Sequence, residues 1–109
     1  MIVVEINRQG VTIDGHAGFA EHGKDIVCAG VSTLAVTLAE SLAGLTQDKV
    51  DCDVRSGHMG IHWEKLSDRG ALLVDSFFLG ICWMANSYPD NVFINNVDGR
   101  KTEGESYEV

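Results

Sequence analysis

Cys28 stands where its residue type and setting could support acyl-transfer chemistry. It follows Asp25 by three residues, at the point where a helical pattern begins. If Asp25 caps that helix, Cys28 lies in the first turn, where backbone N–H groups without an intrahelical partner and the helix dipole stabilise a thiolate. The same N–H groups could receive the oxyanion of a tetrahedral intermediate. We therefore expect Cys28 to act as a nucleophile.

A thiol nucleophile needs a base within hydrogen-bond reach. His16 lies at the end of a predicted strand, just before a glycine-bearing segment that returns to the Cys28 helix. We expect His16 to be this general base. Ser32 follows Cys28 by four residues, which is one helical turn, so its hydroxyl is expected to contact the site or the substrate. His22, in the intervening segment, is a rival base.

Hydrophobic periodicity predicts the elements that position these residues. Apolar residues alternate in segments 2–6 and 11–13, and again in 50–54 and 59–63, which predicts two β-hairpins. Apolar residues three or four apart predict one helix capped by Asp25, and another that starts at Ser67 or Asp68 and ends at Tyr88-Pro89. Residues 92–94 could form a last short strand.

These elements predict a small α+β domain. The order is ββαββα with a last strand, which favours an antiparallel or mixed β-sheet with two helices packed on one face. The chain has 109 residues, of which 45% are apolar, and this favours a single domain over residues 1–99. Residues 100–109 form a polar, acidic segment, which we expect to be a flexible tail.

Composition also limits location and partners. The first residues do not have a basic segment followed by an apolar stretch, and no apolar run reaches the ~18 residues of a membrane span. We therefore expect a cytoplasmic protein without membrane contact. The net charge is −8 and the eight Lys and Arg residues are scattered. Direct binding of nucleic acid is not expected, because it requires clustered cations, and basic peptides are more suitable partners.

The cysteines and histidines outside the Cys28 site predict no further chemistry. Three cysteines at wide spacings indicate neither a disulfide framework nor a CxxC pair, and we expect Cys52 and Cys82 to be core residues in a reducing compartment. His58 and His62 would lie about 13 Å apart on one strand face, too far to share a metal. A zinc site of His16, His22 and Cys28 lacks a clear fourth ligand, so no metal or cofactor is expected.

Two separated blocks of the sequence resemble a known family. They are Gly15-His16-Ala17 and Gly23-Lys24-Asp25-Ile26-Val27-Cys28-Ala29, the second with Ser32, and they closely resemble the motif of the ribosomal-processing cysteine proteases called Prp. The similarity continues through Leu72-Leu73, Phe77 to Ile81 and Tyr88-Pro89, so it covers nearly the whole chain. Gly30 departs from the family's more common alanine, and His22 stands where a tyrosine or another residue is expected.

The resemblance implies a homodimeric α+β endopeptidase of Firmicutes, related bacteria and some of their phages. Members remove an N-terminal extension from a large-subunit ribosomal protein, cutting after an aromatic residue, and related phage capsid or scaffold proteins can also be processed. By position, Cys28 is the nucleophile and His16 the base, with Asp25 and Ser32 as supporting residues. The loop from Gly18 to Lys24, with Gly23, would be a mobile cover over the bound peptide.

The departures at Gly30 and His22 leave a second interpretation open. The chain could be a non-catalytic, ribosome- or capsid-associated module that binds a peptide on the same fold without turnover. Peptide binding without cleavage would favour this interpretation, whereas rapid alkylation of Cys28 near neutral pH would favour the enzyme.

Overall fold

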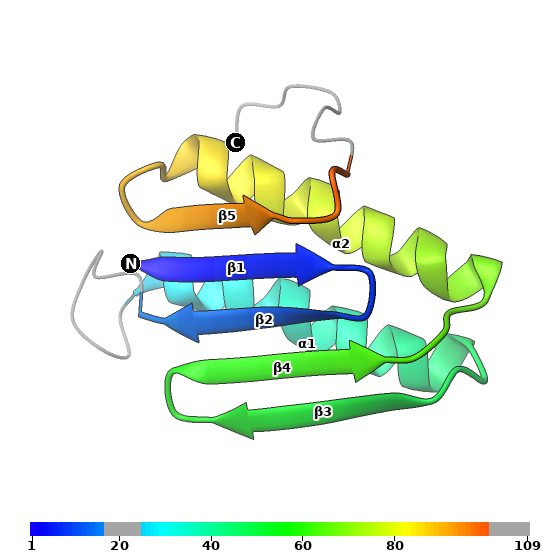
Figure 1. Cartoon of the computed structure of the whole chain (residues 1–109). Coiled ribbons are helices and arrows are strands. Elements are labelled where there is room, and N and C mark those ends of the chain that lie inside the picture. Colours follow the sequence, from blue (N-terminus) through cyan, green and yellow to red (C-terminus); the bar gives the residue numbers. More distant parts are fainter. Residues whose placement is uncertain (17–24, 101–109) are drawn as a thin grey trace.

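Five strands and two helices make up the computed structural model, which describes residues 1–16 and 25–100 (Figure 1). In chain order they are β1 (Ile2–Asn7), β2 (Gly10–Gly15), α1 (Ile26–Leu45), β3 (Val50–Arg55), β4 (His58–Trp63), α2 (Asp68–Ser87) and β5 (Val92–Asn96). Both hairpins, both helices and the last strand are where the sequence predicts them. The α+β fold class is therefore confirmed.

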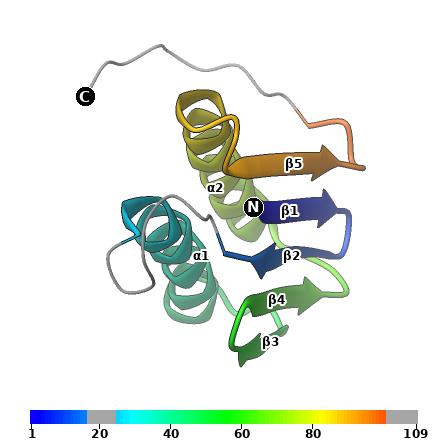
Figure 2. The ribbon, with the colours of Figure 1, turned by 90° about the vertical axis from the view of Figure 1, so that its left-hand side faces the viewer.

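The strands form one mixed sheet in the order β3-β4-β2-β1-β5. The three pairs that join β3, β4, β2 and β1 are antiparallel, whereas β5 runs parallel to β1. The parallel pair follows from α2, which carries the chain back along the sheet before β5 begins. Both helices cover the same face of the sheet, as the end-on view in Figure 2 shows. Within residues 1–16 and 25–100, the opposite face of the sheet carries no helix.

The core lies between the sheet and the helices. Alternate strand residues face inward and meet the apolar stripes of α1 and α2, and each large side chain buried in this way contributes about 1.5–3 kcal/mol. The largest fully buried side chains come from all these elements except β3 and β5: Val4, Ile6, Val11, Val27, Val31, Leu42, Ile61, Val74, Phe78 and Ile81. This packing fixes the first turn of α1 relative to the ends of the strands.

Gly30 lies where α1 approaches α2. A Cβ atom built at this position would be 2.9 Å from the terminal methyl group of Met84. Glycine is less favourable than alanine in a helix by about 1 kcal/mol, which is why the sequence suggests a loosened helix. In the structure, the absence of a side chain at Gly30 leaves room for Met84 between the helices.

Cys52 is exposed, and the prediction that it belongs to the core is wrong. Its neighbour across the sheet is the buried residue Ile61, so Cys52 is on the side of the sheet that faces the helices. It remains exposed because β3 is the edge strand and the helices cover it poorly. Cys82 is 6% exposed in α2, which confirms its predicted core position.

Arg100 is the last described residue, and it is tied to the domain. Its backbone exchanges hydrogen bonds with the Asn96 side chain, and its guanidinium group pairs with Asp75 and with Asp98, the latter at 3.1 Å. These contacts join Arg100 to β5 and α2, and the domain boundary at 99 stays a prediction. The rest of the predicted tail, 101–109, lies outside the described residues.

Both helices have 20 residues and are long and apolar enough, by length and composition alone, to cross a membrane. Core helices of soluble proteins satisfy the same criterion. Here each helix buries one stripe of apolar residues against the sheet. Val31 of α1 and Phe78 of α2 are two of these residues. The absence of membrane contact stays a prediction.

Candidate active site

The first turn of α1 is capped by Asp25. Its carboxylate Oδ1 accepts hydrogen bonds from the backbone N–H groups of Val27 and Cys28, each at 3.0 Å, and its carbonyl accepts from Ala29 at 3.1 Å. The Asp25 residue is only 8% exposed. The predicted cap is thus present, and Cys28 is the third residue of the helix.

His16 follows directly after β2. The strand ends at Gly15, whose φ of +97° lies in the left-handed region that favours glycine. A Cβ atom at Gly15 would overlap the carbonyl oxygen of Met1, so the close approach of these two chain segments also requires glycine. This bend directs His16 out of the sheet toward the start of α1.

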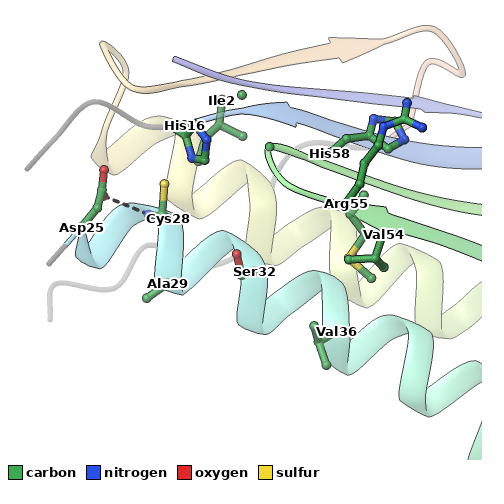
Figure 3. A pocket seen from close by; sticks show the side chains of 13 residues that line it. Ile2, His16, Asp25, Cys28, Ala29, Ser32, Val36, Val54, Arg55 and His58 are labelled. Carbon is green, nitrogen blue, oxygen red and sulfur yellow. Dashed lines mark hydrogen bonds between the residues drawn. The ribbon is translucent and has the colours of Figure 1, made fainter. Parts of the chain in front are cut away.

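Cys28 and His16 line one pocket of about 630 Å³. Figure 3 shows the Cys28 sulfur pointing toward the His16 ring, with Asp25 beside the helix start and Ser32 one turn further along α1. Cys28 is half-buried and His16 is exposed, so the pair can be reached from solvent. The structure therefore brings together all four residues that the sequence predicts for the chemistry.

Two N–H groups that could hold an oxyanion are already in use. The sequence suggests that the first turn of α1 receives the negative oxygen, yet the N–H groups of Val27 and Cys28 donate to Asp25. A carboxylate that satisfies these donors also places a negative charge close to the thiol. The cap and the oxyanion would compete for the same donors, a conflict that helix periodicity cannot reveal.

The far wall of the pocket comes from the β3–β4 hairpin, which sequence reasoning did not connect with the site. The wall residues are Val54, Arg55, Gly57, His58 and Met59. They reach the pocket because β4 pairs with β2, which places the hairpin turn beside the end of β2. The Ser56-Gly57 turn signal was visible in the sequence, but no local pattern gives the order of strands in the sheet.

His58 is a second imidazole in the pocket wall, on the side away from Cys28 (Figure 3). Its Nδ1 lies 2.5 Å from Oδ1 of Asp14 and its Nε2 lies 3.5 Å from Oδ2 of Asp53. A carboxylate only accepts, so the short contact means that Nδ1 of His58 donates to Asp14. His58 therefore links β4 to β2 and is held away from the thiol.

Three of the predicted positions lie outside the described residues. Gly18 and Gly23, expected to belong to the cover over the substrate, and the rival base His22 all fall within 17–24. Their roles stay predictions. Among residues 1–16 and 25–100, no group of three or more His, Cys, Asp or Glu side chains is placed to hold a metal ion.

A half-buried thiol at a helix start, facing an imidazole from a strand end, defines a cysteine peptidase site on a small α+β fold. The chain belongs to the cysteine protease Prp family, whose model matches residues 1–93. It is 32% identical over 104 residues to the ribosomal processing cysteine protease Prp of Staphylococcus aureus, covering 87% of this chain and 98% of that protein. The corresponding protein of Bacillus subtilis is 31% identical over 86 residues, covering 72% and 76%.

Solved structures agree with this family assignment. The S. aureus Prp protease with a covalently linked product peptide superposes with a TM-score of 0.82 at 28% identity, covering 88% of this chain and 99% of that one. SMU.848 from Streptococcus mutans gives a TM-score of 0.69 at 30% identity, covering 89% and 92%. Both likenesses confirm the fold, and the first also supports the assignment as a cysteine protease.

Replacing Asp25 by alanine should destabilise the protein and also change the chemistry of Cys28. Loss of the cap is expected to cost about 1 kcal/mol, whereas Asp25→Asn should cost only a few tenths because asparagine also caps helices. Ser67→Ala is the matched control, because the Ser67 hydroxyl caps α2 by accepting from the Gly70 N–H at 3.1 Å. Urea unfolding measures the stability, and the alkylation rate of Cys28 measures the chemistry.

Both alanine variants should lose similar stability, but only Asp25→Ala should alter the alkylation rate. Equal alkylation of Cys28 in Asp25→Ala, Ser67→Ala and the unchanged protein would contradict a chemical role for Asp25.

Iodoacetamide should distinguish the three thiols by pH. Burial, together with the carboxylates of Asp51 and Glu40, raises the pKa of the Cys52 thiol, and burial raises the pKa of Cys82. Near pH 7 both should therefore be mostly protonated, and Cys28 with its neighbouring base should be labelled first. The Cys52 thiolate fraction should then grow about tenfold for each pH unit until its raised pKa is passed. Mass spectrometry of digested protein gives each rate, and faster labelling of Cys52 at pH 7 would refute this assignment.

Proposed function

We propose that this protein is an endopeptidase that removes an N-terminal extension from a large-subunit ribosomal protein, cutting after an aromatic residue. The observation that carries the proposal is the Cys28 sulfur facing the His16 ring in an open pocket (Figure 3). The relatives named ribosomal processing cysteine protease support the substrate class. A second S. aureus Prp structure, 25% identical with a TM-score of 0.69, holds a substrate peptide, which supports peptide binding in this fold.

The chemistry proceeds in two acyl-transfer steps. His16 takes the proton of Cys28, and the thiolate attacks the scissile carbonyl carbon, so that a C–S bond forms. The C–N bond then breaks, and the leaving amine takes the proton from the His16 imidazolium. Water, deprotonated by His16, attacks the thioester, and the thiol returns as the new carboxyl end of the substrate departs.

Asp25 sets a condition on the first step. The Cys28 N–H can donate to the oxyanion only when Oδ1 of Asp25 releases it, since the two lie 3.0 Å apart in the structure. Oxyanion donors are worth about 10²–10³ in kcat, so a small rotation of the Asp25 carboxylate would have a large effect on the rate. Ser32, one helical turn along the same pocket wall, can donate to the substrate.

The pocket has an apolar wall that suits an aromatic side chain. Val36 of α1 is 50% exposed and Val54 of β3 is 69% exposed, and both line the pocket together with Met59. An aromatic residue placed there would cover this apolar surface, which is favourable by about 25 cal/mol for each Å² removed from water. The net charge of −8 suits the basic extension of a ribosomal protein.

Two broader features belong to the same proposal. The proposal includes a cytoplasmic location, because the wide spacing of the three cysteines indicates no disulfide framework, as is usual in a reducing compartment. A homodimer is also proposed, on the basis of the family resemblance. The exposed apolar side chains of Leu72 and Leu79 on α2 support self-association.

Incubation with a synthetic peptide that spans the processing site of the ribosomal protein tests the activity. We expect a single cut after the aromatic residue, no cut by Cys28→Ala, and a loss of about 10²–10⁴-fold in rate for His16→Ala, the usual contribution of a general base. Cys52→Ala is the control, because it removes an exposed thiol outside the pocket lining. Mass spectrometry of the products gives the cleavage position.

A peptide with alanine in place of the aromatic residue separates the substrate claim from the enzyme claim. It should be cut at least tenfold more slowly if the apolar wall selects the aromatic side chain. Equal cutting of both peptides would contradict the aromatic preference, and equal cutting by Cys28→Ala would contradict the nucleophile. Faster cutting of a phage capsid or scaffold peptide would identify that substrate class instead.

A further inference from the structure

We propose that the β3–β4 turn positions the imidazole of His16, and that Gly57 at this turn is a positioning residue for catalysis. The inference rests on the proposed role of His16 as the base. Gly57 belongs to a hairpin that is remote in sequence from the motif carrying His16 and Cys28, yet it lines the same pocket. Three observations tie the turn to the end of β2.

The first observation is a backbone hydrogen bond. The N–H group of Gly15 donates to the carbonyl oxygen of Gly57 at 2.8 Å. Gly15 is the last residue of β2, and His16 follows it directly. The bond therefore fixes the backbone one residue before His16. A shift of the backbone at Gly15 would also shift the His16 ring.

The second observation is contact between the turn and the ring itself. Gly57 has a φ of +72°, and a Cβ atom built on it would lie 3.4 Å from Nε2 of His16 and 4.0 Å from Cδ2. The edge of the imidazole thus packs over the bare α-carbon of the turn. A methyl group there would lie at ordinary van der Waals distance from Nε2, and the backbone strain of an alanine at this φ would shift the turn against the ring.

The third observation is a side-chain hydrogen bond between the residues of β4 and β2 that adjoin Gly57 and Gly15. His58 follows Gly57 and Asp14 precedes Gly15, and these two residues are partners in the register of β4 and β2. Nδ1 of His58 lies 2.5 Å from Oδ1 of Asp14. The turn is therefore held to the end of β2 by one backbone bond and one side-chain bond, so its position follows that of the sheet.

A base held in this way owes part of its geometry to the backbone of the turn. Misplacing a catalytic group by about 1 Å can cost on the order of 10²-fold in rate, so a contact that fixes the ring has catalytic value. The sheet holds the β3–β4 turn in place, and this turn contacts the His16 imidazole. Gly57 contributes through its carbonyl oxygen and through the space that its missing side chain leaves.

Gly57→Ala tests the proposal, with Gly99→Ala as the matched control. Gly99 has a comparable φ of +65°, and a Cβ atom there would meet nothing within 4 Å, so it carries similar backbone strain far from His16. We expect Gly57→Ala to lower kcat/KM for peptide cleavage by about tenfold or more and to shift its pH profile. Gly99→Ala should keep both within about twofold of the unchanged protein.

Two further measurements separate positioning from general damage. The ring ¹⁵N and ¹H resonances of His16 should move in Gly57→Ala and stay in place in Gly99→Ala. In a His16→Ala background, Gly57→Ala should no longer slow the alkylation of Cys28, because the ring that the turn contacts is gone. Unmoved His16 resonances in Gly57→Ala, or an equal slowing in both backgrounds, would overturn the proposal. Failure of the proposed base would instead appear as unchanged cleavage in His16→Ala alone.

Discussion

The antiparallel pairing of β2 with β4 is the constraint on which the rest of the molecule depends. It joins two hairpins that are separated in sequence by the whole of α1, and so creates a sheet wide enough for two helices to cover. The same pairing places the Ser56-Gly57 turn beside the end of β2 and fixes the direction in which His16 leaves the strand. The core and the site therefore depend on the same β2–β4 register. A slip of this register by one residue would turn Ile61 outward and move the β3–β4 turn away from the His16 ring.

Asp25 shows how stability and catalysis meet at the start of α1. Its carboxylate satisfies two N–H groups of the first helical turn, and this contact stabilises the helix. One of these two groups is the N–H of Cys28 itself, so the carboxylate of the cap lies beside the proposed nucleophile. One carboxylate thus stabilises the helix start and occupies two N–H groups that an oxyanion would also need.

Local patterns predicted the fold well because most of its information is local. The alternation around Val4 and the spacing around Val31 gave strands and helices with nearly the right ends, and the Asp25 cap placed Cys28 in the first turn. The strand order was not predictable, because it depends on pairing between residues far apart in sequence. For this reason the pocket wall around Gly57 was missed. The misplaced Cys52 has the same origin, since alternation predicts which face a residue takes but not whether its strand lies at an edge.

Accessibility alone does not distinguish the reactive cysteine of this chain. Cys52 is more exposed than Cys28, yet partial burial of its thiol and the carboxylates of Asp51 and Glu40 raise the pKa of Cys52. Cys28 instead faces an imidazole across an open pocket (Figure 3). A thiolate needs a partner that can take its proton and carry positive charge, and the His16 ring is placed to do this for Cys28. The proposed role of Cys28 therefore depends on the sheet, because the sheet positions His16 at the end of β2 beside the start of α1.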